Sequence, residues 1–124
     1  MADFLHDDVF DNGLNVLTNN VENLYICSTL PTTFAEASST YKLGTKATPT
    51  IGAPADRASG GREVTVSAIT DGDVQADGTA GFYALTDDSA SKLLAQGDLN
   101  ATQGVTNLNA FTLTAFKIGI PDPA

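Results

Sequence analysis

The chain has 124 residues and a net charge of −9, and 42% of its residues are hydrophobic while 17% are charged. This length suits one domain with a modest core, and the composition excludes a charge-driven disordered chain. Only 6 basic residues stand against 15 acidic ones, which excludes nucleic acid and anionic membranes as natural partners. No apolar run approaches the roughly 18 residues of a membrane span, and the acidic N-terminus lacks the basic residues of a secretory signal. We therefore expect a single β-rich domain over residues 1–124, folded in a cytoplasm.

The first predicted element is an amphipathic helix within residues 1–21. Apolar residues recur there at spacings of four, three and four, which places them on one stripe: Phe10, Leu14, Leu17 and Val21. Asn12-Gly13 is instead typical of a hairpin turn. A turn followed by a strand therefore remains the alternative for residues 8–20.

The next segment, Asn23 to Ser28, predicts a central strand, because both of its alternating faces are largely apolar. Thr33 to Ala37 predicts one helical turn with Phe34 in the core. Tyr41 to Leu43 predicts a short strand. Pro49 and Pro54 interrupt residues 46–55, so this stretch is expected as an edge strand or an extended loop.

The second half of the chain has the most regular strand pattern. Gly61 to Ile69 alternates apolar and polar residues, which is the clearest half-buried strand. A turn is expected at Thr70 to Asp73, and further strands are expected at 74–76, 79–86, 92–97 and 110–120, with a short strand or a loop at 99–105. The alternation in the last segment changes phase between Ala115 and Phe116, which indicates a β-bulge or a strand that crosses between two sheets. About seven short antiparallel strands with one N-terminal helix predict a mainly β fold, a compact β-sandwich or barrel.

Residues that could carry chemistry are few. His6 is the one histidine and Cys27 the one cysteine, so acyl transfer and zinc binding lack their usual groups. The acidic turn at Asp71, Asp73 and Asp77 fails the calcium-loop pattern, because Phe82 stands where the bidentate Glu should be. We predict no catalytic, metal-binding or cofactor-binding residues, and hence no enzyme.

Packing and turn patterns spread over nearly the whole length carry a resemblance to a known family. They are Asn23–Ser28 with Pro31–Ala37, Gly61–Ala68, Gly78–Ala80 with Tyr83–Thr86, Leu93–Ala95, and Phe111–Ile120. On these residues the chain resembles small structural proteins of tailed bacteriophages and prophages. The resemblance implies a β-rich virion component that is present in many copies and has no catalytic residues.

The resemblance leads to a first functional hypothesis, a capsid decoration (cement) protein that stabilises the head by binding the assembled lattice. Its partners would be the major capsid protein or other virion proteins, and a homo-oligomer is expected, with a trimer favoured. Its location would be the virion, after assembly in the host cytoplasm. Residues 1–10 would form an N-terminal arm that binds a partner through Phe4, Leu5 and Val9, and residues 121–124 would form an extended tail.

Two alternatives remain open from the sequence. One keeps the virion but places the protein at the collar, neck or tail as an adaptor for fibres, and the copy number per particle separates it from decoration. The other is a free β-sandwich that binds carbohydrate or another ligand. The absence of Trp and the presence of only three Tyr leave this last alternative a poor stacking surface for sugars.

Overall fold

A computed structural model describes residues 4–5, 13–58 and 60–120 of the chain. In these residues the α-helix is α2 (Asn15–Asn20), and two shorter helical turns are η1 (Glu36–Thr40, π-helical) and η2 (Asp88–Ala90, 3-10). The strands are β1 (Phe4–Leu5), β2 (Asn23–Cys27), β3 (Lys42–Ala47), β4 (Ala55–Asp56), β5 (Arg62–Val66), β6 (Ile69–Val74), β7 (Gly78–Asp87), β8 (Lys92–Val105), β9 (Ala110–Leu113) and β10 (Phe116–Ile120). The mainly β prediction is confirmed, while the predicted number of about seven strands is too low.

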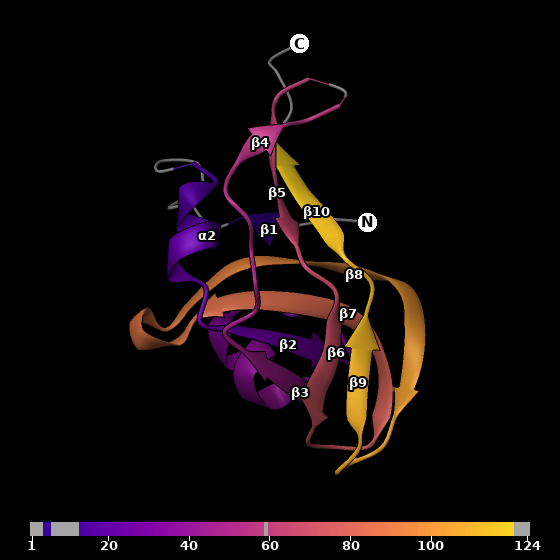
Figure 1. Cartoon of the computed structure of the whole chain (residues 1–124). Helices are drawn as coiled ribbons and strands as arrows, with labels where there is room; N and C mark the ends of the chain where they lie inside the picture. Colours follow the sequence, from indigo (N-terminus) through magenta and orange to yellow (C-terminus); the bar gives the residue numbers. More distant parts are fainter. Residues whose placement is uncertain (1–3, 6–12, 59, 121–124) are drawn as a thin grey trace.

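The strands form two antiparallel sheets. Seven of them pair in the order β1-β8-β7-β2-β3-β6-β9, and the other three pair in the order β10-β5-β4. Figure 1 shows that the larger sheet curls around a core and that the smaller sheet rises from one end of it. The chain passes between the two sheets three times, from β3 into β4, from β5 into β6 and from β9 into β10.

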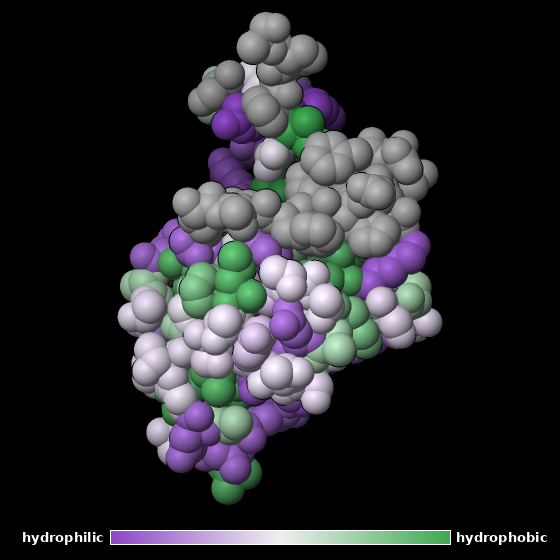
Figure 2. Space-filling model, turned by 180° about the vertical axis from the view of Figure 1, so that it is seen from behind, coloured by the Kyte–Doolittle hydropathy of each residue, from purple (hydrophilic) through white to green (hydrophobic). Residues whose placement is uncertain are grey.

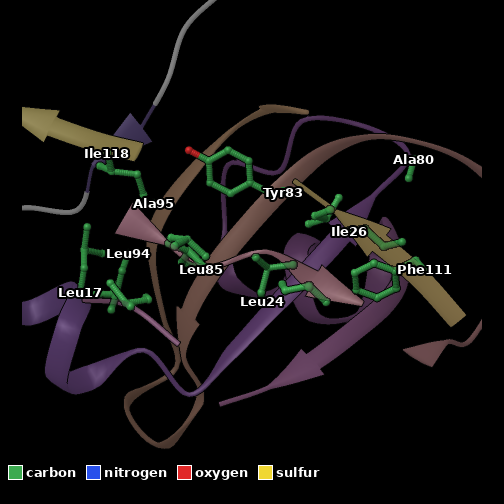
Figure 3. Packing of buried hydrophobic residues seen from close by; sticks show 14 of the residues in the cluster. Leu17, Leu24, Ile26, Ala80, Tyr83, Leu85, Leu94, Ala95, Phe111 and Ile118 are labelled. Carbon is green, nitrogen blue, oxygen red and sulfur yellow. The ribbon is translucent and has the colours of Figure 1, made fainter. Parts of the chain in front are cut away.

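Strand β2 lies in the middle of the larger sheet, between β7 and β3, and is buried on both faces as predicted. Leu24 and Ile26 face the main hydrophobic cluster, which Figure 3 shows together with Leu17, Leu85 and Phe111 from other elements. Tyr25 and Cys27 face a second, smaller cluster that contains Ala37 of η1. A strand with apolar side chains on both faces is thus a strand with a hydrophobic cluster packed against each face.

The helical turn after β2 covers the second face of the strand differently from the prediction. Ala37 is fully buried, whereas Phe34 is only half-buried. The Cys27 Sγ atom lies 3.8 Å from the Ala37 carbonyl oxygen, so the chain passes too close to β2 for a ring to fit between them. The expectation of Phe34 in the core is thus wrong.

The N-terminal helix combines the two alternatives left open by the sequence. Gly13 has a φ of 72°, a left-handed conformation that forms a turn, and α2 begins only at Asn15. Leu14 and Leu17 are buried, as the helical stripe predicts. Residues 1–3 and 6–12, which include Phe10, lie outside the described residues.

The strand predicted at Gly61 to Ile69 is β5, and it lies in the middle of the smaller sheet and ends at Val66. The turn expected at Thr70 to Asp73 is wrong, because these residues belong to β6. Asp-Gly favours a turn locally, but Gly72 serves here as a strand residue beside an aromatic ring. A Cβ atom at Gly72 would lie 2.3 Å from the ring of Phe111.

The C-terminal segment crosses between the sheets, as one of the two sequence alternatives states. Strand β9 pairs with β6 in the larger sheet, and β10 pairs with β5 in the smaller sheet.

Three other strands have bounds that differ from the prediction. Strand β3 continues past the expected end at Leu43 to Ala47. Of the short strand expected at 74–76, only Val74 belongs to a strand, where it ends β6. Strand β8 is one continuous strand that covers the segments expected separately at 92–97 and 99–105.

Candidate interaction surface at the seam of the curled sheet

Strands β8 and β9 are joined by only the four residues 106–109, yet they do not pair with each other as a hairpin. Strand β8 pairs with β7, and β9 pairs with β6 at the other end of the sheet order. The curl of the sheet brings the two strands together again, and side chains connect them. The Gln103 Nε2 atom donates to the Thr112 carbonyl oxygen, and the Asn100 Nδ2 atom donates to the Thr114 Oγ1 atom at 3.3 Å. We call this line of contact, residues 98–103 against residues 112–114, the seam.

The edge of β8 at the seam is irregular. Ala80 of β7 pairs with Gln103 and Phe82 pairs with Asp98, so that four residues of β8 lie opposite Gly81 alone. Such a bulge interrupts the backbone ladder and re-aims the side chains around it. Leu99 in the bulge lines a hollow on each side of the sheet.

The first hollow is a cavity of about 250 Å³ inside the seam, which we call the seam cavity. The rings of Tyr83 and Phe116 form part of its wall, with their centroids 4.5 Å apart. The other lining residues are Asp98, Leu99, Asn100, Ala101, Gln103, Thr112, Leu113 and Thr114. A cavity with apolar and polar groups in its lining can hold a side chain or a small polar molecule.

The second hollow lies on the opposite side of the bulge, and we call it the Phe82 hollow. It is open and has a volume of about 660 Å³. Its lining consists of Ser28, Leu30, Thr79, Gly81, Phe82, Asp98, Leu99 and Thr102. Asp98 is the one charged residue among them, so this hollow can receive an apolar group without stranding many charges.

The N-terminal strand β1 pairs with β8, the strand that also contributes residues 98–103 to the seam. Phe4 pairs with Gln96 and Leu5 pairs with Ala95 on the outer edge of β8. The structure therefore places two of the three predicted partner-binding residues in a backbone ladder of their own chain, next to the bulge. Val9 lies outside the described residues. Partner binding by Phe4, Leu5 and Val9 stays a prediction.

Comparisons with protein-family models, with curated proteins and with solved structures find no match for this chain. A proposal about function therefore has to rest on the geometry of the described residues and on the resemblance carried by the sequence.

A polar cluster near the start of β2 contains the carboxyl group of Asp88. Asp88 accepts hydrogen bonds from the hydroxyl of Tyr25 at 2.6 Å and from the hydroxyl of Thr86. Partial burial opposes ionisation of Asp88, but hydrogen bonds from Thr86, Tyr25 and Asn23 and the charge of Lys42 together lower the pKa of the carboxyl group. Burial and the neighbouring Asp88 raise the pKa of Tyr25, so the phenol remains a hydrogen-bond donor. The cluster thus connects β2 to η2 through hydrogen bonds, and we call it the brace.

Two further acidic groups of the described residues have partners elsewhere in the fold. Lys46 Nζ lies 3.1 Å from Asp71, and Asp77 Oδ1 accepts a hydrogen bond from the Asn107 backbone at 2.7 Å. Among the residues that the structure describes, no group of three or more His, Cys, Asp or Glu side chains could hold a metal ion. In the same residues, no helix has the length and apolar character to cross a bilayer. Figure 2 shows small, separate apolar areas on the rear face among polar ones.

Cys27 is fully buried and free. Burial raises the pKa of its thiol to about 12, because no charge stabilises a thiolate in the smaller cluster. Both the accessibility and the ionisation of this thiol therefore oppose reaction in the folded protein.

We expect Cys27 to react with a disulfide reagent at pH 8 at least roughly a hundredfold more slowly in the native protein than in denaturant. The measurement is the rate of thiol release, with the unfolded chain as control. Equal rates would show that the second face of β2 opens readily, and would contradict the burial described above.

No local pattern marks Asn100, Gln103, Thr112 and Thr114 as a group. They are common polar residues in strands, and only the curl of the sheet makes them neighbours.

Proposed function

We propose that this protein is a non-enzymatic structural component of a tailed-phage virion, which decorates the capsid and stabilises the head by binding the assembled lattice. The observation that supports this proposal is the outer edge of β8. Among the described residues, only the two residues of β1 pair with that edge, whereas β8 is 14 residues long. Residues 98–103 of β8 lie against residues 112–114 at the seam. The part of the edge outside the seam and outside β1 is therefore the part to which an extended segment of another protein can add.

Edge pairing suits a protein with this composition. Backbone hydrogen bonds supply the affinity when an extended segment adds to a sheet, so charged side chains are not needed. A chain with a net charge of −9 and few basic residues would gain little from ion pairs with an acidic neighbour. The large share of uncharged residues is compatible with burial against a lattice.

The stabilising mechanism is mass action. A protein that binds the assembled lattice but not its free subunits stabilises the lattice by about 2.7 kcal/mol when its concentration is a hundred times its dissociation constant. Because the sites repeat over the head, this contribution is repeated at each of them.

Heads that lack the protein test the proposal. We expect them to rupture at lower temperature than complete heads, and we expect purified protein to restore the original temperature. A variant without residues 1–10 serves as control, because it should remain folded and fail to restore the heads. Equal rupture temperatures with and without the protein would overturn the cement role.

Copy number separates decoration from the collar, neck or tail alternative. Decoration predicts a number comparable with that of the major capsid protein, measured by quantitative mass spectrometry of whole particles. A few copies per particle would favour an adaptor for fibres.

The carbohydrate-binding alternative has one structural feature in its favour, the ring pair of Tyr83 and Phe116 beside Asn100 and Gln103 in the seam cavity. Tyr83 is only 8% exposed, so its ring offers little surface for stacking on a sugar. Specific binding on a glycan array would revive this alternative.

A further inference from the structure

The tip between β8 and β9, residues 106–109, carries a leucine in an unusual state. Leu108 is 89% exposed, the highest exposure of a large apolar side chain in the described residues. Its φ is 75°, in the left-handed region that glycine or asparagine tolerates and that other side chains rarely adopt. A single exposed leucine is ordinary, but one that also strains the backbone calls for a reason.

The tip holds this leucine in place through the backbone. The amide of Leu108 donates to the Val74 carbonyl oxygen at 3.1 Å, and the amide of Val74 donates to the Asn109 carbonyl oxygen at 3.0 Å. The amide of Asn107 donates to Asp77 Oδ1 at 2.7 Å. These bonds anchor the turn to the end of β6 and to the segment that follows it, so the backbone that carries Leu108 is held in place before any partner binds.

The same chain offers a site of matching chemistry in the Phe82 hollow. Half-buried Leu30, Phe82 and Leu99 provide its apolar lining. Its volume of about 660 Å³ exceeds the space that one leucine side chain needs. The small residue Gly81 leaves the hollow open.

The net charge of the chain limits which of its surfaces two copies can bring together. Two copies that each carry a net charge of −9 repel each other across acidic surfaces. Residues 106–109 contain no charged side chain, and the Phe82 hollow contains only Asp98. Contact between the tip and the hollow therefore buries mainly apolar surface, and the carboxylates nearest to it are Asp98 in the hollow and Asp77, which already accepts a hydrogen bond from the Asn107 amide.

We propose that Leu108 of one copy inserts into the Phe82 hollow of a second copy. The tip and the hollow are different surfaces, so one such contact per pair is heterologous and repeats from copy to copy until a ring closes. This self-association is a property of the isolated chain, so it can fail while the capsid role stands, and the reverse also holds.

The test is sedimentation of the full chain over a range of concentrations, with two variants on opposite sides of the contact. Leu108→Asn removes the apolar group and suits the left-handed backbone, and Gly81→Gln fills the hollow at a glycine whose added Cβ would meet only Thr102 Cγ2 at 3.6 Å. Each variant should weaken self-association by roughly tenfold or more. Combining them should weaken it little further, because both remove one contact.

Asn107→Ala, at the same tip, is the matched control and should leave self-association unchanged. The thermal midpoint of Leu108→Asn, measured at a concentration where the chain is monomeric, should not fall, which separates loss of contact from loss of fold. Unchanged association of Leu108→Asn, or a wild-type chain that stays monomeric at every concentration, would overturn the proposal. Loss of association in Leu108→Asn alone, with Gly81→Gln unaffected, would overturn the assignment of the hollow.

Discussion

Gly72→Ala is expected to destabilise the folded chain by about 1–3 kcal/mol, and Gly72→Val by more. The added Cβ atom would lie 2.3 Å from the ring of Phe111, a distance that no relaxed contact permits. The ring cannot withdraw freely, because it is 2% exposed and its other neighbours include Gly44, where a Cβ atom would lie 3.2 Å away. The two glycines on neighbouring strands β3 and β6 thus provide the space that this phenylalanine fills.

Phe111→Ala tests the same contact from the other side. Removing a buried phenylalanine side chain costs about 3–5 kcal/mol. In this background Gly72→Ala should cost little, because the atoms that it would contact are gone. A double-mutant cycle in urea therefore predicts a large coupling between the two positions.

Gly104→Ala is the control for these glycine substitutions. Gly104 also lies in a strand, but an added Cβ atom there would meet nothing within 4 Å. This variant should be as stable as the wild type or slightly more so. Equal destabilisation by Gly72→Ala and Gly104→Ala would contradict the role assigned to Phe111.

Asp88→Ala is expected to destabilise the chain by about 1–3 kcal/mol. It removes the acceptor of the Tyr25 and Thr86 hydroxyl groups, and Thr86 is fully buried. Replacement of the exposed Asp73 by Ala is the control and should change the free energy of unfolding by less than about 0.5 kcal/mol. Equal effects of the two substitutions would show that the brace near the start of β2 contributes nothing.

The same residue predicts a loss of stability in acid. Hydrogen bonds lower the pKa of Asp88 in the folded chain, so the unfolded chain binds more protons between the folded and unfolded pKa values. The stabilisation is complete above the unfolded value near 4 and is lost as the pH falls through the lower, folded value. Unfolding in urea at pH 6 and at pH 3 should show a smaller difference for Asp88→Asn than for the wild type. An unchanged difference would assign the acid sensitivity to other groups, such as Glu22, whose pKa hydrogen bonds from Ser89 also lower.

Local patterns predicted the structure correctly where the alternation of apolar residues along a segment matches the faces of that segment that the fold buries. Asn23 to Ser28 alternates on two apolar faces and is the central, doubly covered strand. The phase change at Ala115 and Phe116 marks the crossing between sheets, because a strand that changes sheets must change the side on which its apolar residues lie. The alternation of Gly61 to Val66 likewise predicted strand β5. The prolines of residues 46–55 predicted an extended stretch, which leads into the edge strand β4.

The sequence by itself thus determined that this is a mainly β protein, that the segment starting at Asn23 is a strand covered on both faces, and that the apolar alternation changes phase where β9 gives way to β10. The tertiary structure decided the role of Gly72, which is a turn residue by local preference and a strand residue because Phe111 occupies its missing side chain. It also decided the seam, where Asn100 and Gln103 bridge strands that a hairpin would have paired directly. Local preference reports the environment of a few neighbouring residues, whereas these contacts depend on how far the whole sheet curls, which is the sum of twists and bulges along all of its strands.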